Sequence, residues 1–221
     1  MELEEEELGP LPSGRHGFSR EQVAAHQRER LIAGIAAAVA RDGYNAVTIS
    51  HITKEARVSR RAFYAHFDTM EACFLAAFDV VVGHLEELIR VAAESEPDWP
   101  RQVVAGLRSA LEFFDREPDL ARLCMVESVN AGPAVAERFQ DAVARIASLL
   151  AAGRRERSNP RPLPASTEES LVGALISTVS RSIAFPKPGR LVDLLPDFLE
   201  FVLMPYLGLE AAHRLAAESA S

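Results

Sequence analysis

The segment from Ser59 to Phe67, SRRAFYAHF, carries side chains suited to a phosphate-bearing partner. Its two arginines can donate hydrogen bonds to phosphate oxygens or to guanine edges, and its tyrosine and histidine can donate to phosphates. Phe63 and Phe67 are four residues apart, so in a helix they would lie together on the opposite, buried face. The chemistry indicated is recognition of a nucleic acid by the outer face of a short helix.

Two short helices separated by a tight turn would position these side chains. Thr48 is a good N-cap for a first helix, whose apolar face would be formed by Ile49, Ile52 and Ala56. Arg57 and Val58 interrupt the helical period, and Ser59 can cap the second helix. This helix-turn-helix pattern would place the second helix in the major groove of DNA. The candidate DNA-binding residues are Thr48, Ser59, Arg60, Arg61, Ala62, Tyr64 and His66.

The charge distribution favours this interpretation. Residues 15–67 hold nine Lys and Arg against four Asp and Glu, whereas the whole chain has a net charge of −8. A basic region within an acidic protein is typical of a nucleic-acid site. Two alternatives stay open on these residues alone. The arginines could line the solvated face of an ordinary helical protein, or the helix-turn-helix shape could serve a protein-interaction module without specific DNA readout.

Residues 28–75 resemble the DNA-binding domain of the TetR (tetracycline-repressor-like) family of bacterial transcriptional regulators. The matching runs are RDGYNAVTI, ITKEARVSRRAFYAHF and DTMEACFLAAF. The resemblance implies an all-α fold, with a three-helix head followed by a helical ligand-binding and dimerisation body. It also implies a homodimeric repressor that leaves a palindromic operator in double-stranded DNA when a small molecule binds.

Two positions depart from the family pattern. Arg57 stands where the family usually has a turn glycine, and it must tolerate the backbone if the turn keeps a positive φ. Met70 stands where a lysine usually contacts a phosphate. Both departures predict weaker DNA binding rather than a different fold.

The chain divides into three predicted regions. Residues 1–20 combine a glutamate-rich run, too polar to order itself, with a basic arm at Arg15, His16 and Arg20. The arm could reach into the minor groove or be a solvated linker. Residues 21–67 form the predicted DNA-binding domain and 68–221 the predicted effector-binding and dimerisation domain. Beyond the helix-turn-helix, the apolar periodicity predicts helices at about 21–42, 70–93, 100–115, 118–127, 133–157, 166–185 and 190–207.

The body offers a candidate effector pocket. Its bulky apolar candidates are Phe78, Trp99, Phe113, Phe114, Cys124, Met125 and Phe139, although each could simply be a core residue. No buried charge suggests itself as a ligand partner, which favours a neutral or apolar effector. The resemblance assigns the homodimer interface to the last two predicted helices, at about 166–207.

Several function classes lack their sequence signatures. We find no glycine-rich phosphate loop, nucleophile elbow or ligand cluster, so we expect neither an enzyme nor a catalytic residue, cofactor or resident metal. His84 and Glu87 could bind a metal, but such a pair is more often solvated. Cys73 and Cys124 fit buried, reduced thiols. No apolar run could span a bilayer and no signal sequence is recognisable, so we expect a cytoplasmic protein without membrane partners.

Overall fold

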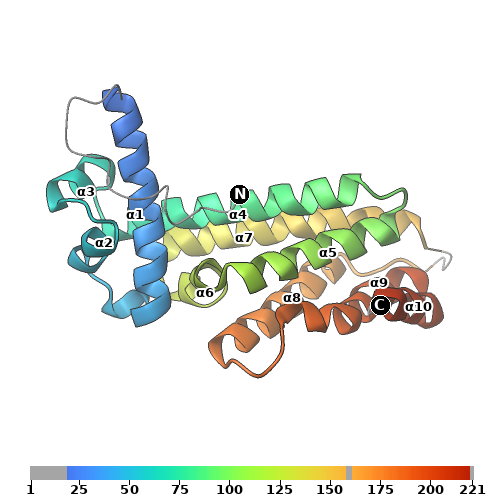
Figure 1. Cartoon of the computed structure of the whole chain (residues 1–221). Helices are drawn as coiled ribbons and strands as arrows, with labels where there is room; N and C mark the ends of the chain where they lie inside the picture. The colour runs from blue at the N-terminus through green and yellow to red at the C-terminus, as the bar shows by residue number, and fades with distance from the viewer. Residues whose placement is uncertain (1–18, 158–160, 220–221) are drawn as a thin grey trace.

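The structure is a computed structural model that describes residues 19–157 and 161–219. Within these ranges the chain forms ten α-helices and no strand (Figure 1), so the predicted all-α fold is confirmed. Residues 1–14 and the arm residues Arg15 and His16 lie outside the described residues. The predictions made for them stay predictions, and Arg20 begins the first helix.

Four elements form the part of the molecule that we call the head. They are α1 (Arg20–Asp42), the 3-10 helix η1 (Tyr44–Ala46), α2 (Ile49–Glu55) and α3 (Arg60–His66). The remaining elements form the body. They are α4 (Met70–Glu94), α5 (Trp99–Arg116), α6 (Pro118–Met125), η2 (Glu127–Asn130), α7 (Pro133–Leu150), η3 (Ala151–Arg155), α8 (Thr167–Ala184), η4 (Leu191–Leu194), α9 (Leu195–Leu207) and α10 (Leu209–Ser219).

Local capping explains where the head helices begin and end. The hydroxyls of Thr48 and Ser59 accept hydrogen bonds from backbone N–H groups at the starts of α2 and α3, as predicted. Ser19 and Gln22 form a capping box at the start of α1. Gly43 ends α1 with φ 77°, a conformation that few residues other than glycine adopt.

The head is not an isolated lobe. The buried stripe of α1, centred on Leu31, Ile35 and Val39, packs against α2 and α3 and also against α4 and α6. One continuous cluster of buried side chains therefore runs from the head into the body. Helices α4, α5 and α7 extend away from the head, and α8, α9 and α10 cover one side of them (Figure 1).

Three features of the C-terminal half differ from the sequence predictions. The long helix predicted to reach residue 157 ends at Leu150 and tightens into η3, where Arg154 pairs with Glu168 at 2.6 Å. Ser166 and Glu169 have the spacing that predicts a capping box at the start of α8, but Ser166 makes no side-chain cap, so that prediction is wrong. The chain also does not end its helical structure at 207, because α10 follows Gly208 and packs along α9. Within the part of the chain described here, no helix is long and apolar enough to cross a membrane.

Candidate nucleic-acid interface and internal cavity

Helix α3 presents its polar side chains to solvent. Arg60 and Arg61 are exposed, and the Tyr64 side chain is 52% exposed while its ring edge packs on Phe63 at 5.5 Å. Phe63 is fully buried beneath them, as the four-residue spacing predicted. The outer face of α3 is therefore available to a partner, and its inner face fixes the helix to the head.

The cap residues and their neighbours occupy different environments. Thr48 and Ser59 are exposed, so their hydroxyls and the nearby helix N-termini are open to a phosphate. Ala62 and His66 are half-buried. Burial, together with nearby Arg28, lowers the pKa of His66, which favours the neutral ring, a form that can donate one hydrogen bond.

The turn between α2 and α3 is held by α1. Arg57 has φ 50°, so the turn keeps the left-handed conformation for which the family usually has a glycine. Arg30 is buried on α1, and its guanidinium donates a 2.8 Å hydrogen bond to the Arg57 carbonyl. Burial, and then the charge of Arg57, lower the pKa of Arg30. Met70, the second departure from the family pattern, packs against the core instead of reaching outward.

Exposed positive side chains gather around the turn and along α3. Glu55 at the end of α2 and Asp42 at the end of α1 both pair with Arg41. The single positive charge of Arg41 therefore compensates one of these two negative charges. The exposed cations Lys54, Arg57, Arg60 and Arg61 have no carboxylate within ion-pair distance among the described residues. The arrangement suits phosphate binding and salt-sensitive association.

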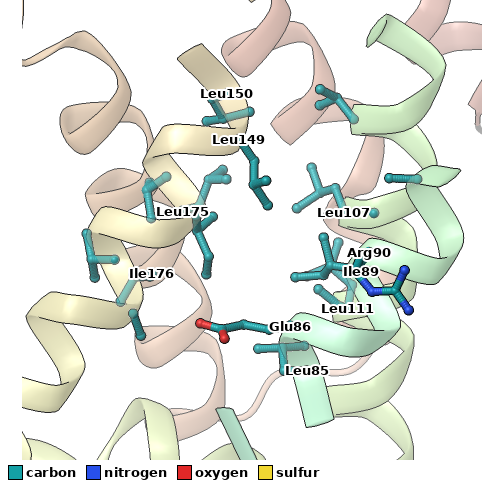
Figure 2. A pocket seen from close by; sticks show the side chains of 18 of the residues that line it. Leu85, Glu86, Ile89, Arg90, Leu107, Leu111, Leu149, Leu150, Leu175 and Ile176 are labelled. Carbon is teal, nitrogen blue, oxygen red and sulfur yellow. The ribbon is translucent and has the colours of Figure 1, made fainter. Parts of the chain in front are cut away.

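A cavity of about 530 Å³ lies within the body, walled by helices α4 to α9. Leucine and isoleucine side chains from α4, α5, α7 and α8 face it from opposite sides (Figure 2). Its size falls within the range of about 300–1,000 Å³ typical of small-molecule sites. Six of the seven candidate pocket residues line it, namely Phe78, Trp99, Phe114, Cys124, Met125 and Phe139.

The seventh candidate, Phe113, does not line the cavity. Its ring packs against His84 at 5.4 Å and Phe114 at 5.6 Å, so it belongs to the core between α4 and α5. Sequence reasoning also missed the wall built by α8 and α9, which includes Leu175, Ile176, Phe198 and Val202. Their broad apolar faces are visible in the sequence, but the family resemblance accounts for them by dimerisation alone.

The charged groups beside the cavity are engaged with one another. Glu86 accepts a 2.7 Å hydrogen bond from Arg145 across the seam between α4 and α7. Arg90 pairs with Glu87 and Glu94 on its own helix, at 2.6 Å each. The Arg90 guanidinium points away from the cavity, while Glu86 lies at its border (Figure 2).

The cysteines have the properties of buried thiols. Both Cys73 and Cys124 are free and buried, and burial raises the pKa of Cys73 to about 12 and that of Cys124 as well. The two thiols are therefore protonated at neutral pH. Among the described residues, no group of three His, Cys, Asp or Glu could hold a metal ion. Glu87 is paired with Arg90, and His84 packs on Phe113.

Comparison with known proteins identifies relatives of the head and of the whole fold. Residues 31–77 match the family described as bacterial regulatory proteins, tetR family. The HTH-type transcriptional regulator EthR of Mycolicibacterium smegmatis is 26% identical over 151 residues, which cover 65% of this chain and 68% of that protein. EthR of Mycobacterium tuberculosis is 27% identical over 124 residues, and the chain spans 57% of its length.

Solved structures share the fold at low sequence identity. The fatty acid degradation regulator FadR of Bacillus halodurans superposes with a TM-score of 0.71 at 17% identity, covering 79% of this chain and 97% of that one. FadR of Bacillus subtilis, crystallised in complex with stearoyl-CoA, gives a TM-score of 0.70 at 15% identity, covering 81% and 98%. The likeness extends over the head and the body together.

Proposed function

The chain is a transcriptional regulator of the TetR family, and we propose that it represses transcription as a homodimer that releases its operator when an apolar ligand fills the cavity. It binds DNA through its helix-turn-helix and is not an enzyme. Repression, the operator, the ligand and the dimer interface are the parts that we propose.

The exposed row on α3 supports the proposal for DNA. Arg60, Arg61, Ala62 and Tyr64 would contact base edges and the adjacent backbone, and the hydroxyls of Thr48 and Ser59 would bind phosphates. His66 would add a neutral hydrogen bond to a phosphate. In a homodimer, two α3 helices roughly 34 Å apart would enter successive major grooves, which requires a palindromic operator.

The outer faces of α8 and α9 support the proposed dimer. On α9, Phe201 and Met204 are each 42% exposed and lie one turn apart. The exposed residues of α8 are Glu169, Ser170, Gly173, Ser177 and Arg181, and a side chain at Gly173 would meet no atom within 4 Å. Small residues on one helix and bulky apolar residues on the next suit a self-complementary four-helix contact.

The cavity supports an uncharged, apolar ligand. Its lining is mostly aliphatic and aromatic, and Arg90 is the one cation among the described lining residues. Arg90 is paired with Glu87 and Glu94, and Arg145 with Glu86, so a phosphate would have to displace a carboxylate from either arginine. The acyl portion of a ligand such as the stearoyl-CoA bound by the Bacillus subtilis regulator suits this cavity better than its coenzyme A portion.

Selection of random double-stranded DNA by the full-length protein tests the first half of the proposal. An enriched inverted repeat, bound by two protomers, is expected. The double variant Arg60→Ala, Arg61→Ala should enrich nothing, whereas Arg214→Ala on the exposed face of α10 should select the wild-type repeat. A folded dimer that selects no sequence would favour the protein-interaction alternative.

Hexadecan-1-ol and hexadecanoyl-CoA test the second half against the selected DNA. The chain has one tryptophan, Trp99, which lines the cavity, so a change in its fluorescence reports binding directly. We expect hexadecan-1-ol to change the fluorescence of Trp99 and to release the DNA. Release by hexadecanoyl-CoA but not by the alcohol would contradict a neutral ligand.

A further inference from the structure

We propose that Glu127 is a positioning residue that joins the wall of the cavity to the segment leading into the helix-turn-helix. The inference goes beyond the proposed function, because it names the contact through which occupancy of the cavity would reach the head. It rests on that proposed function only for the consequence on DNA binding. The mechanical link itself follows from the contacts of Glu127.

The carboxylate of Glu127 is buried between the head and the body. The residue is only 5% exposed, although it is charged. Its Oε2 accepts a 3.0 Å hydrogen bond from the backbone N–H of Tyr44, which is 83 residues away in the sequence. Its Oε1 lies 3.0 Å from the guanidinium of Arg122 on α6. A Cβ atom placed on Gly43 would lie 3.6 Å from Oε2, so the head backbone approaches the carboxylate closely.

On the head side, the hydrogen bond from Tyr44 to Glu127 fixes the segment that connects α1 to α2. Tyr44 begins η1, and Thr48, four residues later, caps α2. The Tyr44 ring packs edge-on against Phe74 of α4 with 5.1 Å between centroids. The position of α2, and of α3 beyond it, therefore depends on where Tyr44 is held. Tyr44 is the residue at which contacts from α4 and from η2 meet.

On the body side, Glu127 follows the cavity wall directly. Cys124 and Met125 line the cavity, and Glu127 comes two residues after Met125. The Ser128 hydroxyl donates a 2.6 Å hydrogen bond to the Cys124 carbonyl, which ties η2 to the end of α6. A ligand that pushes on Cys124 or Met125 would thus move the carboxylate with the helix end.

The burial of the carboxylate makes this contact difficult to loosen. A buried charge separated from its partners loses compensating hydrogen bonds that water does not replace, which is strongly unfavourable. A shift of α6 is therefore expected to carry Tyr44 with it, or to break the contact altogether. Either result changes the head geometry and with it the spacing of two α3 helices in a dimer.

The body contains a matched control for Glu127. The side chains of Glu127 and Glu168 are both 6% exposed. Each pairs with an arginine that is 34% exposed, Arg122 for Glu127 and Arg154 for Glu168. Glu168 also accepts a hydrogen bond from Tyr206, so it fastens α8 to α9 and makes no hydrogen bond to the head. Replacing either glutamate removes a buried, arginine-paired charge, but only Glu127 touches the head.

Hydrogen exchange of the full-length protein tests the link without any ligand. In Glu127→Leu, amides in residues 43–48 should exchange about tenfold faster, because the Tyr44 N–H loses its acceptor and the local opening energy falls. Glu127→Gln keeps an acceptor and should retain most of the protection. Glu168→Leu should lower the Tm without affecting 43–48. Unchanged exchange in Glu127→Leu, or an equal rise in Glu168→Leu, would overturn the proposal.

DNA binding with hexadecan-1-ol as probe tests the consequence. We expect the ratio of DNA dissociation constants with and without the alcohol to approach one in Glu127→Leu and to stay as in the wild type in Glu168→Leu. The alcohol should still change the fluorescence of Trp99 in Glu127→Leu. In Glu168→Leu the size of that change is expected to differ, because the Tyr206 ring released from Glu168 packs on Trp99 with 4.9 Å between centroids. If the alcohol binds and the ratio in Glu127→Leu matches the wild type, the coupling role is wrong. If the alcohol does not change the fluorescence of wild-type Trp99, the neutral-ligand proposal fails, and the exchange measurement still decides the role of Glu127.

Discussion

The guanidinium of Arg30 on α1 donates a 2.8 Å hydrogen bond to the main-chain carbonyl of Arg57, the residue with φ 50° between α2 and α3. A buried cation of the scaffold thus stabilises the one non-glycine residue with positive φ among those described. The bond uses a backbone acceptor, so it survives any change of side chain at position 57. The backbone strain at Arg57 and the hydrogen bond from Arg30 can be tested separately.

Arg57→Gly should raise the free energy of unfolding by about 1 kcal/mol. Relief of the strain of a non-glycine residue in the left-handed region stabilises the fold by about 1–3 kcal/mol. The greater freedom of glycine in the unfolded chain opposes this gain by about 0.5–1 kcal/mol. Urea unfolding measures the difference. Arg57→Ala keeps the Cβ atom and should not stabilise the protein; if it does so equally, the backbone is not strained.

Arg30→Met should lower the free energy of unfolding by about 1–3 kcal/mol. The substitution keeps much of the apolar stem but leaves the Arg57 carbonyl without its charged donor. Exchange of amides in residues 56–60 should accelerate at the same time. A stability loss without faster exchange at the turn would indicate that Arg30 acts through packing alone.

Arg60→Ala and Arg61→Ala should each weaken binding to the selected operator without lowering the Tm, because both side chains are exposed. An arginine that contacts a base edge is expected to contribute about 1–3 kcal/mol and to relax the preference at one base pair. Loss of an arginine that contacts only phosphate should weaken binding to all DNA sequences equally and reduce the salt dependence of binding. Fluorescence anisotropy over a salt series separates these cases, with Arg214→Ala as the control.

Phe201→Glu should convert the dimer into a monomer. Its side chain is 42% exposed on the proposed α9 face, where two glutamates would meet across the two-fold axis. Light scattering after gel filtration measures the mass. Val129→Glu, at a residue 78% exposed in η2 and outside the proposed interface, should leave the mass unchanged. A Phe201→Glu protein that stays dimeric would move the interface elsewhere.

Iodoacetamide at about pH 8 should modify neither cysteine in the folded protein. Burial raises the pKa of Cys73 to about 12 and that of Cys124 too, so both thiols keep their protons well above neutral pH and lack the reactive thiolate. Mass spectrometry should find two adducts in denaturant and none without it. Fast single labelling of the native protein would show that one thiol is accessible.

The sequence allowed prediction of what depends on neighbouring residues. The caps at Thr48 and Ser59 and the buried pair Phe63 and Phe67 each follow from a pattern a few residues long. The positive φ at Arg57 was conditional on the turn geometry that the family resemblance implies. The same kind of reasoning failed at Ser166, where Thr167 instead donates to the Pro164 carbonyl.

What depends on contacts between distant segments could not be predicted. Glu127 and Tyr44 are 83 residues apart, and no spacing rule connects them. In the sequence, Glu168 resembles any glutamate in the first turn of a helix. Only the fold brings Arg154 and Tyr206 into contact with its carboxylate. Phe113 and Phe114 are adjacent and both aromatic. Only the packing of α4 against α5 determines that Phe113 lies in the core and Phe114 lines the cavity.

The continuous packing of α1 against α4 and α6 also limits how such regulators can be recombined. A hybrid that takes residues 21–67 from this protein and the rest from a relative would cut through the cluster around Leu31, Cys73 and Phe74. It would also pair a foreign η2 with the native Tyr44. The unit that can be transplanted with its specificity intact therefore includes the first turns of α4, together with whichever residue of the recipient faces the Tyr44 amide.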